Sequence, residues 1–132
     1  MKQPKLHSIH HAAIICSDYQ RSKRFYTELL GLAVLDENYR AERDSYKLDL
    51  VLPDGGQVEL FSMPGAPKRL SYPEAQGLRH LAFAVADIDE WVEWLVDNQV
   101  AHEPVRVDPY TGKRFLFFAD PDDLPLELYE QA

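Results

Sequence analysis

The sequence is poor in the features that mark several protein classes. It holds one cysteine, Cys16, so no disulfide can form within the chain, and reducing cytoplasm is the simplest expected compartment. It has no stretch near the roughly 20 apolar residues of a membrane span. Its first residues lack an apolar run of about 7–15 residues, so no secretory signal peptide is expected. Lysine and arginine number 14 against 22 acidic residues, and the net charge of −8 argues against nucleic-acid binding.

What the sequence does contain is typical of one globular domain. Its 132 residues are 45% hydrophobic and 27% charged, which is enough apolar surface for a buried core. We therefore expect a single domain over residues 1–132, with a small molecule rather than a membrane or a nucleic acid as its partner.

The strongest pattern is an internal repeat. "HAAIIC" at His11 and "HLAFAV" at His80 each open with histidine and continue with small apolar residues. An aspartate follows each histidine by seven residues, at Asp18 and Asp87, and an amphipathic helix comes next. Asp18 with Ser17 can accept hydrogen bonds from the first N–H groups of its helix. The two halves therefore start with the same strand and helix.

The two halves also end alike. "PDGGQVELF" at 53–61 and "PDDLPLELY" at 121–129 carry a glutamate in the middle of a short alternating strand. Glu59 follows His11 by 48 residues, and Glu127 follows His80 by 47. Matched offsets of this kind indicate a duplication, with module one at about 7–63, a linker at about 64–77 and module two at about 78–131.

Each module reads as strand, helix and three further strands, which predicts an α+β fold. One helix runs from Asp18 to Gly31, with Phe25, Leu29 and Leu30 on its apolar face, and the other covers 88–98 with Trp91, Trp94 and Leu95 facing inward. Two paired βαβββ modules would form a curved mixed sheet around one hollow. The expected strands are 8–16, 32–40, 45–53 and 57–63, then 79–85, 102–107, 113–119 and 124–130.

Strand alternation places a histidine and a glutamate of each module on one face. A carboxylate buried in a strand without a partner is costly, and a divalent ion compensates it. Imidazole and carboxylate suit Zn, Ni, Co, Fe or Mn. The sequence therefore predicts one divalent metal ion with four ligands: His11, Glu59, His80 and Glu127.

The other candidate ligands lack a repeat partner. His10 is adjacent to His11 and is expected on the opposite strand face, although it could compete for the ion. His7 and His102 are expected on the surface, and Cys16 is expected to serve packing.

The segments "HHAAIICSDYQRSKRFYTELLGL", "VELFS", "GLRHLAFAVADID" and "DPDDLPLELYE" resemble the glyoxalase superfamily, also called the vicinal-oxygen-chelate fold. The resemblance covers nearly the whole chain, and the predicted ligands fall where glyoxalase I enzymes hold their metal. It implies a metal-dependent lyase or isomerase, similar to lactoylglutathione lyase, that acts on a substrate with adjacent oxygens. It also implies a homodimer and a structural role for the helix signature at Asp18, Ser22, Phe25, Tyr26 and Gly31.

The resemblance implies catalytic roles for the two glutamates. A metal chelated by two substrate oxygens stabilises a developing enolate, and a nearby carboxylate can move a proton between the two carbons. By resemblance, Glu127 is the expected base, with Glu59 as the electrostatic partner or second base.

Two positions depart from bacterial glyoxalase I. That family places arginine and asparagine, which hold glutathione, where this sequence has Ile15 and Met63. The loss of these two polar contacts weakens the expectation of glutathione recognition, and other cations remain for an anionic substrate. These cations are Arg43, Lys47, Arg79, Lys113 and Arg114, of which the last two are expected to point outward from a hairpin turn.

Three alternatives remain open. An extradiol-type dioxygenase uses two histidines and one carboxylate, and fosfomycin-type thiol transfer also uses three ligands. A non-catalytic ligand-binding or resistance protein needs no metal. The metal site could lie within one chain or be shared across a dimer.

Overall fold

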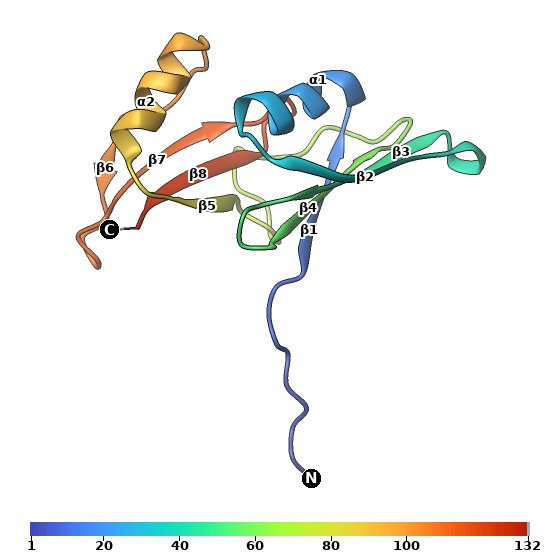
Figure 1. Cartoon of the computed structure of the whole chain (residues 1–132), viewed down its shortest axis with the longest axis horizontal. Coiled ribbons are helices and arrows are strands. Elements are labelled where there is room, and N and C mark those ends of the chain that lie inside the picture. Colours follow the sequence, from blue (N-terminus) through green and yellow to red (C-terminus); the bar gives the residue numbers. More distant parts are fainter. Residues whose placement is uncertain (132) are drawn as a thin grey trace. The chain divides into compact units, whose positions relative to one another are not determined.

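The computed structural model of the chain describes residues 1–131, which form two compact units (Figure 1). The first unit is Met1–Ala66 and the second begins at Pro67, so the boundary falls inside the segment expected as a linker. Each unit runs strand, helix and three strands, and each contains one four-stranded mixed sheet. The predicted α+β class with two βαβββ modules is confirmed.

The first unit pairs its first strand with its last. Its sheet has the order β1-β4-β3-β2, with β1 parallel to β4 and the other neighbours antiparallel. A parallel pair needs a crossover connection, and α1 supplies part of it. The elements are β1 (His11–Cys16), α1 (Tyr19–Arg24), a π-helical turn η1 (Phe25–Leu29), β2 (Ala33–Arg40), a 3₁₀ turn η2 (Ala41–Arg43), β3 (Ser45–Val51) and β4 (Gln57–Ser62).

The residues predicted to begin and end the helix of the first unit do so in the structure. The Asp18 carboxylate accepts a hydrogen bond from the Arg21 N–H at 3.2 Å and caps α1. Gly31 ends the helical segment with a φ of +78°, a conformation that glycine adopts at little cost. Tyr26 is fully buried, although the sequence prediction assigned the apolar face to its neighbours.

The core of the first unit lies between its sheet and α1. Figure 1 shows α1 over one face of the sheet, and the Tyr19 ring of α1 stacks on Tyr46 of β3 with ring centroids 4.2 Å apart. The buried side chains on this face are Ile14, Cys16, Leu48, Leu50, Val58 and Leu60. Because strand side chains alternate, the intervening residues lie on the opposite face, which we call the open face of the unit.

The second unit repeats this topology. Its sheet has the order β5-β8-β7-β6, and β5 is parallel to β8. The main buried side chains are Ile88, Leu95, Leu116, Phe118, Leu126 and Leu128. The elements are β5 (Leu81–Val85), α2 (Ile88–Asp97), β6 (Arg106–Val107), β7 (Arg114–Ala119) and β8 (Pro125–Glu130).

Two expectations for α2 and the strand after it are wrong. Trp94 is 43% exposed rather than inward, because the 3.6-residue period places it at the edge of the face that Ile88 and Leu95 bury. The strand expected at 102–107 is reduced to β6 and a single bridge between His102 and Phe118. Pro104 interrupts it, since proline has no N–H for the ladder.

Arg114 joins α2 to its sheet. Its guanidinium donates to Glu130 at 2.9 and 3.1 Å and to Asp89 at 3.2 Å, and Glu130 also accepts from the Ile88 N–H at 3.0 Å. These bonds hold the pKa of Glu130 below its usual range, chiefly through Arg114. The expectation that Arg114 points outward from a turn is therefore wrong.

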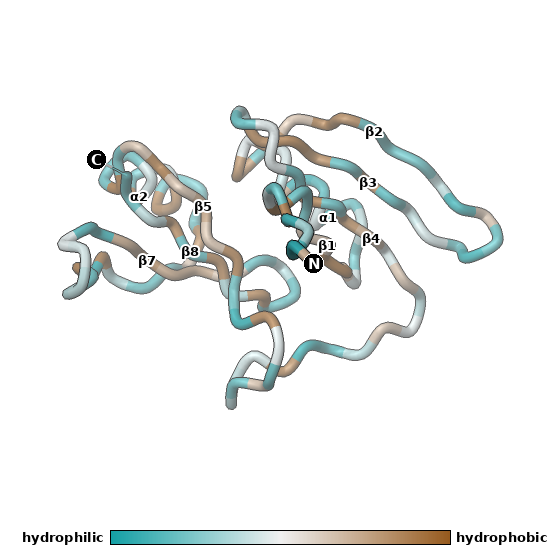
Figure 2. The backbone as a smooth tube through the Cα atoms, turned by 90° about the horizontal axis from the view of Figure 1, so that it is seen from below, coloured by the Kyte–Doolittle hydropathy of each residue, from teal (hydrophilic) through white to brown (hydrophobic). Residues whose placement is uncertain are grey.

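Hydropathy along the chain follows this architecture. Figure 2 shows hydrophobic stretches along β5 and β7 and a mainly hydrophilic tip on the β2–β3 hairpin. Of the helices within residues 1–131, none has the length and apolar character that crossing a membrane would require.

Candidate metal centre

The first unit brings two predicted ligands together. Glu59 pairs with Ala13 in the parallel β1–β4 register, so His11, two residues before Ala13, is a diagonal neighbour of Glu59 on the open face. His11 Nε2 lies 3.5 Å from Glu59 Oε2. The Glu59 side chain is mostly buried and that of His11 is partly exposed.

The second unit contains the same arrangement. Glu127 pairs with Ala82 in the parallel β5–β8 register, and His80 directly precedes β5. His80 Nε2 lies 3.2 Å from Glu127 Oε1, again with the carboxylate more buried than the imidazole. The ring of Phe117, which pairs with Glu127, meets His80 edge to face at 4.9 Å between centroids.

Both pairs fit a metal by distance and by donor type. Two donors bound to one ion at about 2.1 Å, with about 90–110° between the bonds, lie about 3.0–3.4 Å apart. The observed separations of 3.2 and 3.5 Å are close to this range. His80 Nδ1 is buried without a hydrogen-bond partner among the described residues, so Nε2 makes the polar contact of that ring.

Each unit supplies half of the predicted ligand set. Within residues 1–131, no three His, Cys, Asp or Glu side chains gather as a complete metal site. The structure therefore brings His11 to Glu59 and His80 to Glu127, and the sharing of one ion by both pairs stays a prediction.

The neighbouring histidine behaves differently from the prediction. His10 Nδ1 lies 2.9 Å from His11 Nδ1, so its ring turns towards His11 rather than away. The β1–β4 ladder starts at His11, and strand alternation therefore does not fix the side chain of His10. His7 is exposed, as expected, and Cys16 is buried in the core.

Charged groups surround the first pair on its open face. Asp49 pairs with Glu59 across β3 and β4, and the Lys47 ammonium lies 2.8 Å from Asp49. This hydrogen bond is the main reason why the pKa of Lys47 is raised. Ile15 and Met63 are 49% and 38% exposed.

The open face of the second unit is aromatic instead. Phe115 and Phe117 of β7 share it with Glu127, and the Arg106 guanidinium lies over both rings, at 5.0 and 5.8 Å from the centroids. Of the other predicted cations, Arg79 lies 3.6 Å from Glu74.

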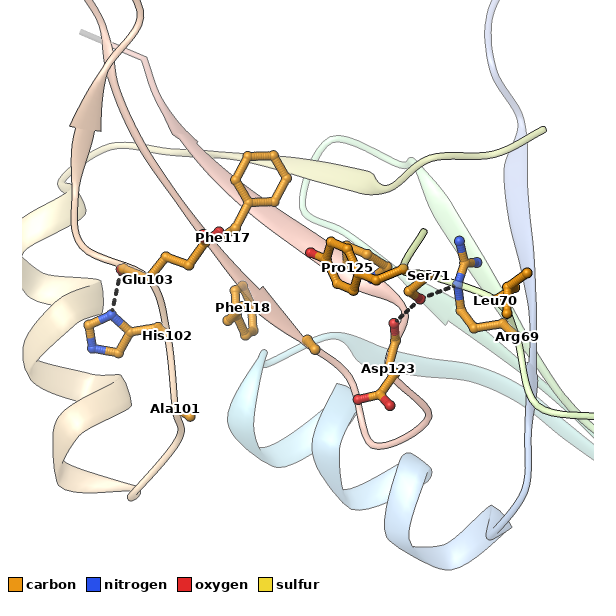
Figure 3. Close-up of a pocket in the computed structure, with 12 residues that line it drawn as sticks. Arg69, Leu70, Ser71, Ala101, His102, Glu103, Phe117, Phe118, Asp123 and Pro125 are labelled. Atoms are coloured by element: carbon orange, nitrogen blue, oxygen red, sulfur yellow. Dashed lines mark hydrogen bonds between the residues drawn. The ribbon is translucent and has the colours of Figure 1, made fainter. Parts of the chain in front are cut away.

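A cavity of about 500 Å³ lies beside this face (Figure 3). The Ser71 hydroxyl donates to the Asp123 carbonyl at 2.6 Å and ties the 69–72 segment to the turn between β7 and β8. His102, expected on the surface, lines the cavity, and so does Phe117, which also contacts His80. No sequence signal indicated this cavity. The lining residues are Arg69, Leu70, Ser71, Tyr72, Ala101, His102, Glu103, Phe117, Phe118, Ala119, Asp123 and Pro125.

Comparison with known families decides what this fold is. The model of the Glyoxalase/Bleomycin resistance protein/Dioxygenase superfamily matches residues 8–128. The chain belongs to this superfamily. The match spans both units and includes all four predicted ligands. The resemblance inferred from the sequence is thereby confirmed at the level of the superfamily, whose members commonly use a divalent metal ion and act on small molecules.

Several superfamily relatives match nearly the whole chain. The uncharacterized protein YwkD of Bacillus subtilis (strain 168) is 60% identical over 96% of this chain and 98% of its own. A solved glyoxalase family protein from Enterococcus faecalis has a TM-score of 0.86 and 52% identity, covering 93% of this chain and 97% of that one.

Two more distant relatives carry names of enzymes. The metallothiol transferase FosB of Staphylococcus saprophyticus is 29% identical, over 94% of this chain and 77% of its own. The 2-epi-5-epi-valiolone epimerase of an Actinomyces species is 28% identical, over 92% of this chain and 78% of its own. The superfamily therefore includes enzymes of different reaction classes.

Proposed function

We propose that this protein is a metal-dependent lyase or isomerase of the glyoxalase type. One divalent ion would be held by His11, Glu59, His80 and Glu127, either within a chain or across a homodimer. The observation that carries the proposal is the histidine–glutamate pair that occurs once in each unit, with Nε2 to carboxylate separations of 3.5 and 3.2 Å.

The reaction proposed is a proton transfer on a small substrate with adjacent oxygens. The bound ion would polarise those oxygens and lower the cost of removing a proton from the neighbouring carbon. Glu127 would take that proton and return it to the adjacent carbon, while Glu59 holds negative charge opposite it or serves as a second base. The mostly buried carboxylates and the apolar ring of Phe117 limit the access of water to the base.

One second candidate has its own support. Similarity to FosB favours thiol transfer, in which a thiolate attacks an electrophilic carbon and no proton moves between carbons. Similarity to the epimerase favours proton transfer at carbon, and this agrees with our first choice. The proposed alternatives of an extradiol dioxygenase or a metal-free binding protein would need fewer ligands or none.

The test combines metal analysis with an assay. Elemental analysis of wild type loaded with Ni, Co, Zn, Mn or Fe is expected to give one ion per chain, and His80→Ala is expected to lose it. Hemithioacetal isomerisation and thiol addition to an epoxide would then be compared in the loaded protein. Glu127→Gln is expected to keep a bound ion and lose turnover at least about 100-fold, as removal of a general base commonly does.

A matched control uses an exposed glutamate. Glu93 lies on the exposed side of α2, and Glu93→Gln should leave both metal content and turnover unchanged. Full turnover in metal-loaded Glu127→Gln would refute the assignment of Glu127 as the base. Absence of metal from every loaded wild-type sample would refute the proposal that the protein is a metal-dependent enzyme.

A further inference from the structure

We propose that Arg40 forms an anion-binding site on the open face of the first unit, beside the His11–Glu59 pair. The proposal deepens the proposed function, because it implies a substrate that carries an oxyanion apart from its adjacent metal-binding oxygens. The occupant is a phosphate-type or carboxylate group, and the two are distinguished by the test below.

Strand register places Arg40 on the open face. Arg40 is the last residue of β2 and pairs with Ser45 at the start of β3, and paired residues project to the same side of a sheet. Ser45 precedes Lys47 by two residues and so shares its face. The Arg40 guanidinium donates to the Ser45 hydroxyl at 3.0 Å.

The ring of Phe61 connects Arg40 with the metal ligand. The Arg40 guanidinium lies over this ring, 5.0 Å from its centroid. Phe61 follows Glu59 by two residues on β4, which places it about 7 Å farther along the same face. An anion at Arg40 would therefore be separated from the His11–Glu59 pair by about one aromatic ring.

The hydrogen-bonding of Arg40 is incomplete. A guanidinium carries five N–H donors, yet within residues 1–131 its partners are the Ser45 hydroxyl and the face of Phe61. Its Nε is buried with no acceptor and is closed to a ligand, so an anion would bind the terminal Nη donors. A half-buried cation with unpaired donors is costly, and an oxyanion is the partner that a guanidinium fork binds best.

The neighbouring cation on this face differs in its partners. Lys47 pairs with Phe61 in register, but both oxygens of Asp49 occupy its ammonium at 2.8 and 3.0 Å. Asp36 also lies on this face, paired with Asp49 across β2 and β3. Lys47 therefore offsets local negative charge, while Arg40 remains the residue with donors available for an anion.

The test is a titration of metal-free full-length protein with inorganic phosphate at constant ionic strength, followed by NMR. We expect a saturable shift of the Arg40 Nε–H signal and of the Phe61 amide. Arg40→Ala should weaken phosphate binding about tenfold or more, since charge-assisted hydrogen bonds are lost. Arg40→Lys keeps the positive charge but loses the planar guanidinium donors. Its affinity for phosphate should therefore lie between those of wild type and Arg40→Ala.

The matched control is Arg24→Ala at the exposed last residue of α1, which should bind phosphate within about twofold of wild type. A parallel titration with acetate identifies the group: tighter acetate binding assigns a carboxylate, and tighter phosphate binding assigns a tetrahedral oxyanion. Backbone NMR spectra of each variant confirm folding.

Three results would overturn the proposal: no saturable shift, an equal affinity in Arg40→Ala, or a change in oligomeric state in Arg40→Ala that identifies a second copy as the true partner of Arg40. The metal content of Arg40→Ala should match wild type. A wild type that binds metal but no anion refutes this inference alone, whereas one that binds phosphate through Arg40 but no metal refutes the proposed function alone.

Discussion

Thermal unfolding with and without metal offers a sharp test of the His–Glu pairs. A ligand that binds only the folded state adds about 2.7 kcal/mol of stability at about 100 times its Kd. For a domain of this size, about 1 kcal/mol raises Tm by roughly 3–5 °C, so wild type should gain about 10 °C. Differential scanning fluorimetry with and without Ni or Co measures this shift.

His80→Ala removes one of the two donors of the second pair. Loss of the outer partners of a metal ligand already weakens binding about 10–100-fold, and loss of the ligand itself should reach at least the upper figure. A metal concentration of about 100 times the wild-type Kd would then equal the Kd of the variant. It would add about 0.4 kcal/mol to the stability of the variant, which corresponds to a rise in Tm of about 1–2 °C. His11→Ala should behave alike, because its Nε2 holds the equivalent position.

His7→Ala is the matched control, since His7 is exposed and precedes the first strand. It should retain the full metal-induced shift of about 10 °C. A full shift in His80→Ala or in His11→Ala would refute the assignment of that histidine as a ligand, and equal losses in all three variants would indicate unspecific binding.

Two further predictions concern stability. Arg114→Met should lower Tm at neutral pH, because Arg114 lowers the pKa of Glu130 in the folded state. A lowered carboxyl pKa stabilises the folded protein above the unfolded pKa of about 4.5, and this stabilisation is lost as the pH falls through the lowered pKa. The difference in Tm between the variant and wild type should therefore become smaller in acid. Melting curves recorded from pH 7 downward measure it, and a difference that stays constant with pH would contradict the prediction. Leu60→Ala should cost about 2–5 kcal/mol in urea unfolding, since Leu60 is fully buried, whereas Leu6→Ala at an exposed site should cost less than about 0.5 kcal/mol. Similar losses in the two leucine variants would contradict the assigned core.

The internal repeat predicted both histidine–glutamate pairs, because a duplication preserves the spacing of residues as well as their types. Matched spacing of His11 and Glu59 with His80 and Glu127 was enough to predict that each histidine lies beside its glutamate, as the structure shows. Propensity and capping signals also located the helices and most strands. Asp18 and Asp87 accept hydrogen bonds at the starts of α1 and α2.

The features that sequence reasoning missed depend on contacts between distant segments. The position of Arg40 over Phe61 follows from the β2–β3 register and from the return of β4, neither of which periodicity reveals. The cavity in Figure 3 needs the 69–72 segment, expected as linker, to fold against Asp123. His10 turned towards His11 because it precedes the ladder.

The parallel pairing of first and last strands has a consequence for folding kinetics. Each histidine–glutamate pair joins residues 47 or 48 positions apart, so neither pair exists until the ends of its unit have met. Closing loops of this length costs chain entropy that must be overcome before the contacts can form, so these contacts tend to form late. Metal bound there would slow unfolding while leaving the folding rate almost unchanged, and would lengthen the lifetime of the native state.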